Sequence, residues 1–276
     1  MINVGNVLTP LAFPGSLAYA TNLANVFFGL GAFLSPLAIG FLVRRFSFPV
    51  ALSVFGGLSL VPAALALGVD FSALTPASPS RADPNTTGSE EIGALFGDPV
   101  LWLCGFALFF YGPLEASMSA WTTTYLGEKG LSEETASGLL SAFWLTFMGA
   151  RLLTAFTLPP GREAMFILVL ALACVVVLTG VVLGRSPKLA IGMVLGAGLV
   201  FGPIFPTIMA ILLGHFDARL HGRAVGMLFA IGGIGWTAIP ILIGAYARQT
   251  SVQRGFAIAV AAAIGLSGIA LALAVR

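Results

Sequence analysis

Glu115 is the residue of this sequence whose position most invites a chemical role. It lies near the middle of 99-PVLWLCGFALFFYGPLEASMSAWTTTYLG-127, which carries no other charged residue. Tyr111, Ser119 and Thr122 are spaced so that an α-helix would place them on the same face as Glu115. A carboxyl group among hydroxyl groups can exchange a proton or hydrogen-bond a polar solute. We therefore interpret these four residues as a candidate proton- or solute-binding stripe.

The element that carries this stripe is expected to cross a membrane. Hydrophobic residues make up 58% of the chain and charged residues only 9%, against about 25% charged in typical soluble domains. A run of about 20 apolar residues spans the hydrocarbon core, and the predicted spans are 20–43, 48–68, 99–126, 137–157, 164–184, 188–213, 223–247 and 255–275. These runs lack the alternation of barrel strands. The sequence predicts an all-α polytopic membrane protein whose surface partner is the lipid bilayer.

A carboxylate inside such a span requires a reason. At mid-bilayer its charged form costs on the order of 3 kcal/mol on insertion scales, so the polar face must point toward protein or water. Gly112-Pro113 lies within one turn before Glu115 and can bend the helix beside a cavity. We interpret Glu115 as binding a proton, a solute hydroxyl, or each in turn. A purely structural hydrogen bond to another helix is the alternative.

Other residues are candidates for the same cavity. Trp121 offers a ring for stacking and Asn6 an amide for hydroxyl recognition. The two prolines of 201-FGPIFPT-207 predict a bent helix, which forms either a gate or a plain kink. The possible gate or cavity residues are Phe201, Phe205, Thr207, Trp144 and Trp236. Packing is the alternative for each of the aromatic residues.

The remaining polar residues are given structural or solvent-exposed roles. Arg151, near the end of the fourth span, is expected to reach the membrane surface or pair with a loop acid. His215 and His221 lie in 214-GHFDARLHGR-223, a polar loop that we expect to be solvated and not a metal site. No cofactor or metal signature is present in the sequence, and the net charge of +2 gives no indication of nucleic-acid binding.

Two spans share the pattern G-x-G-x4-P-x3-G, in 29-GLGAFLSPLAIG-40 and 233-GIGWTAIPILIG-244. The offset is 204 residues, from Gly29 to Gly233, and it also aligns Arg44 with Arg248. Small residues at this spacing allow close helix packing. The helix-packing positions predicted from the repeat are Gly29, Gly31, Pro36, Gly40, Gly233, Gly235, Pro240 and Gly244. The pattern favours an internal repeat.

The repeat predicts a unit of six spans. Residues 99–276 then form a complete second unit, and residues 1–68 hold the end of a fourth span followed by the fifth and sixth. Residues 69–98, rich in Pro, Ser, Thr and Asp, are expected to be the linker, with a short surface helix beginning near Ser89. We expect the missing amino-terminal helices to be supplied by a longer native chain.

This organisation resembles the major facilitator superfamily. Within it, 109-FFYGPLEASMSAWTTTYL-126 is similar to the seventh helix of the fucose and glucose/galactose permease group, and 22-NLANVFFGLGAFLSP-36 to the fifth. The segment 201-FGPIFPTIMA-210 is similar to the tenth, and residues 223–244 to the eleventh. The resemblance implies a secondary transporter of a small polar solute, a sugar, coupled to protons by alternating access. It also implies a linker that faces the cytoplasm, and we expect a bacterial cytoplasmic membrane.

Three alternatives to this transporter are considered. An exporter of drugs or metabolites would use the same fold. The motif 265-GLSG-268 matches the nucleophile of intramembrane serine proteases, but both histidines lie outside the predicted spans, so the general base is lacking and we expect no enzyme. Finally, a chain without a complete first unit is expected to be inactive alone or dependent on a partner.

Overall fold

The computed structural model describes residues 16–68 and 88–276, and these ranges are helical with no strand. The helices are α2 (Leu17–Arg45), α3 (Phe48–Leu67), α4 (Gly88–Gly97), α5 (Pro99–Glu128), α6 (Glu133–Thr157), α7 (Glu163–Leu183), α8 (Pro187–Phe201), α9 (Ile204–His215), the short 3₁₀ helix η2 (Ala218–Leu220), α10 (His221–Ala247) and α11 (Val252–Ala274). Eight helical segments in these ranges are long and apolar enough to cross a membrane. The predicted all-α polytopic fold is confirmed.

The predicted bent span is two helices. The span expected at 188–213 consists of α8 and α9, which are interrupted at Gly202 and Pro203. Two residues follow Phe201 before α9 resumes at Ile204. Proline has no backbone N–H, so Pro203 and Pro206 each remove one helical hydrogen bond. By contrast, α5 continues through Pro113 without interruption.

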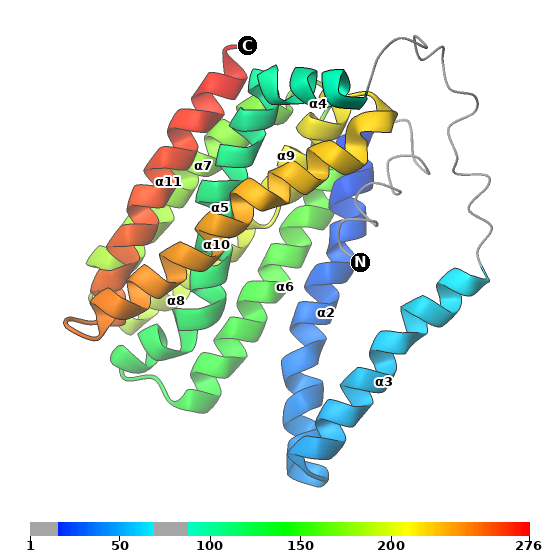
Figure 1. Cartoon of the computed structure of the whole chain (residues 1–276). Helices are drawn as coiled ribbons and strands as arrows, with labels where there is room; N and C mark the ends of the chain where they lie inside the picture. Colours follow the sequence, from blue (N-terminus) through cyan, green and yellow to red (C-terminus); the bar gives the residue numbers. More distant parts are fainter. Residues whose placement is uncertain (1–15, 69–87) are drawn as a thin grey trace.

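Local sequence explains where the helices begin. Asp98 accepts a hydrogen bond from the backbone N–H of Val100 and Pro99 follows it at the first helical position of α5, a strong combination for starting a helix. Ser132 caps α6, Ser186 caps α8 and Ser251 caps α11 in the same manner. The short helix α4 confirms the one expected near Ser89, and it lies at the end of the bundle that holds the carboxyl terminus (Figure 1).

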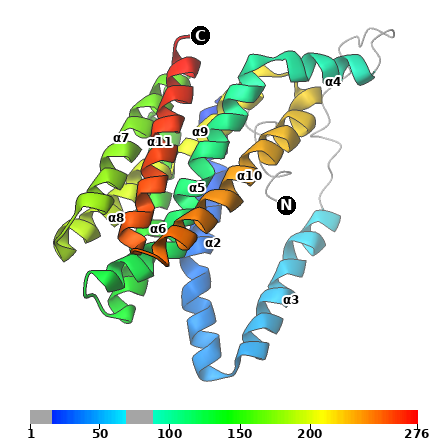
Figure 2. The ribbon, with the colours of Figure 1, turned by 60° about the vertical axis from the view of Figure 1, so that its left-hand side comes forward.

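The bundle is built around α5. This helix packs against α10, α11 and α9, and α10 crosses it obliquely (Figure 2). Helix α2 packs along α6 and α9, and α11 along α7. Cys104 on α5 and Cys174 on α7 are buried and form no disulfide, so they pack as small apolar residues. The polar stripe on α5 therefore faces the interior of the bundle over most of its length.

Helix α3 lies apart from the other spans. It diverges from the bundle after the turn that joins it to α2 (Figure 1), and Ala51 is its one buried residue. Large apolar side chains are exposed along it, including Leu52, Leu60 and Leu65. Such surface suits lipid or further helices and not water.

Candidate functional site

Glu115 lies in the interior of the bundle on α5, and only 4% of its surface is exposed. Tyr111, one turn earlier, is fully buried, and its hydroxyl oxygen lies 2.9 Å from Glu115 Oε2. The same hydroxyl oxygen also lies 2.9 Å from the backbone carbonyl oxygen of Phe201, the last residue of α8. The predicted i, i+4 pairing is present, and it reaches the break between α8 and α9.

Arg151 is not where the sequence analysis placed it. The prediction that it reaches the membrane surface is wrong, because its side chain is only 1% exposed. Its Nε donates to the carbonyl oxygen of Gly202 at 2.7 Å, and one terminal nitrogen donates to the carbonyl oxygen of Asn25 at 2.9 Å. Its guanidinium lies 4.3 Å from the ring centroid of Phe147, a favourable position for a cation over an aromatic face. Arg151 therefore joins α6 to α2 and to the α8–α9 break.

Glu115 and Arg151 line one cavity of about 50 Å³. Five helices contribute to its wall, and the lining residues are Asn25 and Phe28 from α2, Glu115 from α5, Arg151 from α6, Phe205 from α9, and Phe229 and Trp236 from α10. Arg151 also interacts electrostatically with Glu115 and Tyr111. The volume is far below the roughly 300–1,000 Å³ of usual ligand pockets. It suits one or a few water molecules.

The other predicted cavity and gate residues divide between this cavity and its surroundings. Phe205 and Trp236 line it. Thr207 is fully buried and its hydroxyl donates to the carbonyl oxygen of Pro203 at 2.7 Å, across the first turn of α9. Phe201 is fully buried and contributes its backbone carbonyl group to Tyr111. Trp144 packs against Phe28, Phe143 and Phe147 and borders a separate open pocket between α2 and α6.

The other predicted residues that the structure describes do not line the cavity with Glu115. Thr122 is fully buried, and within residues 16–68 and 88–276 its hydroxyl has no hydrogen-bond partner. Ser119 is exposed. Trp121 faces α10 on another side of the helix, where a Cβ added to Gly244 would lie 2.7 Å from its ring. Asn6 lies outside the described residues.

The repeat glycines meet very different surroundings. A Cβ added to Gly29 would lie 3.1 Å from the Cβ of Met148 on α6, and one added to Gly235 would clash with the carbonyl oxygen of Phe109 on α5. At Gly31 and Gly233 a Cβ would meet no described atom within 4 Å, and at Gly40 only the side chain of Arg44 on the same helix. Of the two repeat prolines, Pro240 lies inside α10, and Pro36 lies within α2, with its side chain outside the description.

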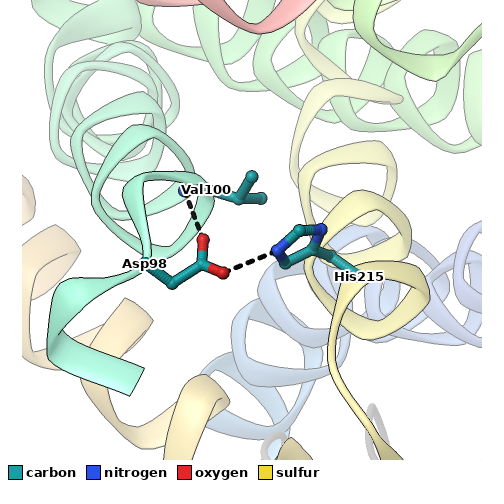
Figure 3. A network of polar contacts seen from close by, with 3 residues as sticks. All are labelled: Asp98, Val100 and His215. Carbon is teal, nitrogen blue, oxygen red and sulfur yellow. Dashed lines mark hydrogen bonds and ion pairs between the residues drawn. The ribbon is translucent and has the colours of Figure 1, made fainter. Parts of the chain in front are cut away.

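The two histidines lie at the α9–α10 connection. His215 Nε2 lies 2.8 Å from Asp98 Oδ2, the carboxylate whose other oxygen caps α5 (Figure 3). Burial acts to raise the pKa of Asp98, but hydrogen bonds from His215 and from the Val100 backbone hold it below its ordinary value. His221 Nε2 lies within 2.9 Å of the carbonyl oxygens of Leu213 and Phe216. His221 is 6% exposed, so the prediction of a solvated residue is wrong for it, because it closes the end of α9.

Three lining residues, Asn25, Phe28 and Phe229, are not among the candidates predicted from the sequence. Asn25 had a detectable signal, since it is an amide in an apolar span, and it is 6% exposed. Phe28 lies three residues after Asn25 and so shares its helix face. Phe229 had none, because one phenylalanine among 22 in the chain carries no information about its neighbours.

The comparisons with known proteins agree with this architecture. The family model described as Major Facilitator Superfamily matches residues 1–240. "Bypass of stop codon protein 6" of Saccharomyces cerevisiae is 25% identical over 285 residues, covering 91% of this chain and 56% of that protein. A "Glucose/galactose transporter" of Brucella abortus is 23% identical over 262 residues, covering 90% of this chain and 62% of that protein. The chain thus spans 56% to 62% of the length of these relatives.

Two solved structures share the fold. The crystal structure of FucP, a major facilitator superfamily transporter in the outward conformation, superposes with a TM-score of 0.76 at 15% identity, covering 98% of this chain and 71% of that one. A variant of the E. coli fucose:proton symporter FucP gives a TM-score of 0.73 at 15% identity, with 97% and 72% covered. At this level of identity the likeness concerns the fold alone.

Proposed function

Because the chain belongs to the major facilitator superfamily, we propose that it acts in a proton-coupled secondary transporter of a small polar solute, most simply a sugar. Glu115 is the observation that carries the proposal, since it is a carboxyl group buried in the middle of a span beside a cavity. Intramembrane acids of this kind usually mark ion or substrate pathways. The permease relative and the fucose symporter support the sugar and the proton. We propose a bacterial cytoplasmic membrane as its location, since one relative is a transporter of the bacterium Brucella abortus.

The composition of the cavity wall supports a sugar. Asn25, Glu115 and Arg151 offer donors and acceptors for hydroxyl groups, and Phe28 and Trp236 offer aromatic faces. At about 50 Å³ the cavity is large enough for a water molecule but too small for a hexose. We infer that the sugar binds between this wall and helices of the other half, with Glu115 carrying the proton.

The glycine pattern supports a two-half architecture. Gly29 packs against α6, whereas its repeat partner Gly233 has open space. Conversely Gly235 and Gly244 pack against α5, whereas their partners Gly31 and Gly40 meet no helix other than their own among the described residues. A glycine that contacts no other helix in α2 or α10 thus corresponds to a closely packed glycine in the other of these two helices. This is expected if further helices, equivalent to α5 and α6, cover the uncovered glycines. We therefore propose that residues 99–276 form one six-helix half, 1–68 the end of the other, and 69–98 the linker.

The same exposed surfaces favour inactivity of the 276-residue chain by itself. Without the further helices, the exposed hydroxyl groups of Ser119 and Thr124 on α5 and of Thr237 on α10 would face lipid. Alternating access also requires two halves. Uptake by vesicles that contain only this chain would contradict the inference.

An enzymatic role is set aside because the family is one of transporters. The serine of 265-GLSG-268 is used locally, since Ser267 Oγ donates to the carbonyl oxygen of Ala263 on its own helix at 2.9 Å.

The substitution Glu115→Gln tests the proposed coupling. In vesicles that contain the native transporter, a gradient of one pH unit supports at most about tenfold accumulation when one proton accompanies each solute. We expect Glu115→Gln to reduce accumulation to onefold while exchange of labelled for unlabelled sugar continues, because the amide cannot carry a proton but keeps its hydrogen-bonding shape. Glu134→Gln, an exposed acid on α6, is the control. Normal accumulation by Glu115→Gln would refute the role.

A further inference from the structure

We propose that Tyr111 is a positioning residue that transmits the protonation state of Glu115 to the break between α8 and α9. The inference rests on the proposed proton-carrying role of Glu115. It adds a route by which gain or loss of that proton changes the backbone of a neighbouring span.

The hydroxyl group of Tyr111 has too few protons to donate to both of its neighbours. Its hydroxyl oxygen lies 2.9 Å from Glu115 Oε2 and 2.9 Å from the carbonyl oxygen of Phe201, but the hydroxyl has one proton. Both contacts are hydrogen bonds only if Glu115 is protonated and donates to Tyr111, which in turn donates to Phe201. When Glu115 releases its proton to water in the cavity, two acceptors compete for the tyrosine proton. A charged acceptor forms the stronger bond, so Tyr111 turns to the carboxylate and the Phe201 carbonyl group loses its partner.

The backbone at the break depends on such side-chain donors. In a continuous helix the carbonyl oxygen of Gly202 would accept from the N–H of residue 206. That residue is Pro206, which has no N–H. Arg151 Nε fills the position at 2.7 Å. Two successive carbonyl groups, of Phe201 and Gly202, are thus held by side chains from α5 and α6.

Both side chains that hold these carbonyl groups also interact electrostatically with Glu115. Tyr111 and Arg151 are the titratable or charged groups that act on Glu115, from α5 and α6, and Cys174 on α7 acts on Tyr111. From α2, α9 and α10 the cavity receives only the uncharged side chains of Asn25, Phe28, Phe205, Phe229 and Trp236. A change of charge at Glu115 therefore acts on the break through these few groups.

Amide hydrogen exchange of residues 199–207 in the purified native transporter tests the proposal. We expect exchange at the break, corrected for the intrinsic effect of pH on amide exchange, to rise about fivefold as Glu115 loses its proton, the change that a net hydrogen bond of about 1 kcal/mol produces. In Glu115→Gln the side-chain amide still donates to Tyr111, so exchange should stay at the low level across the pH range. In Tyr111→Phe exchange should be high at every pH.

Tyr125→Phe is the matched control. Tyr125 is also buried on α5 and its hydroxyl also donates to a backbone carbonyl group of another helix, that of Val181 at 3.2 Å. This variant loses the same atom but should keep the pH response of the break. A pH response in Tyr111→Phe equal to that of the wild type would overturn the proposal, as would a response that persists in Glu115→Gln. Transport is measured separately, so loss of coupling in Glu115→Gln with an unchanged exchange response would refute the Tyr111 link and leave the proposed function standing.

Discussion

The contact of α10 with α5 gives a prediction that can be worked out from two glycines on one helix. A Cβ added to Gly235 would clash with the backbone carbonyl oxygen of Phe109, whereas one added to Gly233 would meet no described atom within 4 Å. The obstacle at Gly235 is backbone and cannot be relieved by a rotamer change. Gly235→Ala therefore requires α10 to move away from α5.

The pair isolates the packing contribution. Both alanine substitutions gain the same helix propensity, about 1 kcal/mol, so this contribution cancels when the two variants are compared. What remains is the cost of overpacking, typically 1–3 kcal/mol. We expect Gly235→Ala to be less stable than Gly233→Ala by about that amount.

The displacement of α10 by Gly235→Ala should also change the cavity beside Glu115. Trp236 follows Gly235 and lines the cavity with Glu115, and its ring would lie 2.8 Å from a Cβ at Gly112. Displacement of α10 would move this ring, so Gly235→Ala should also weaken solute binding. Gly233→Ala leaves this contact unchanged, because a Cβ there would meet no described atom within 4 Å. A loss of solute binding in Gly233→Ala would therefore report on the further helix that we propose over it.

The assay is the free energy of unfolding of each variant in detergent micelles, measured by circular dichroism during denaturant titration. Equal stabilities, within about 0.5 kcal/mol, would refute the close approach of α10 to α5. Wild-type solute affinity in a destabilised Gly235→Ala variant would instead refute the link to Trp236.

Two further predictions concern the ends of α5. Because the pKa of Asp98 is lowered in the folded state, its contribution to stability is complete above the ordinary aspartate pKa of about 3.9 and is lost as the pH falls through the folded-state value. The melting temperature of Asp98→Asn should therefore depend less on pH below about 4 than that of the wild type. Parallel curves of melting temperature against pH for the two proteins would contradict this. At the other end, Glu128 accepts hydrogen bonds from the backbone N–H groups of Val252 at 2.7 Å and Gln253 at 3.1 Å, where α11 begins. Glu128→Ala should lower the free energy of unfolding by about 1 kcal/mol, as loss of a helix cap does. Glu128→Gln keeps an acceptor and should lower it by less. Equal decreases in the two variants would show that the charge of Glu128 matters and not its hydrogen bonds.

Features that depend on neighbouring residues in the chain could be predicted from the sequence. The eight spans follow from the length of the apolar runs, and the bend at residues 201–207 follows from two prolines without N–H groups. The pairing of Tyr111 with Glu115 follows from the helical repeat, since residues four apart share a face. These are consequences of local covalent and helical geometry.

Arg151 shows what only the tertiary structure decided. Its place in the sequence, six residues before the end of α6, is compatible with a side chain that reaches the membrane surface. Its actual partners, the carbonyl groups of Gly202 and Asn25, lie on helices that sequence periodicity does not bring near it. Ser119 shares a helix face with Glu115 but is exposed, and Trp121 packs against Gly244 of α10 and does not line the cavity. Periodicity determines which side chains share a helix face, but which helix covers that face depends on packing between segments far apart in the chain.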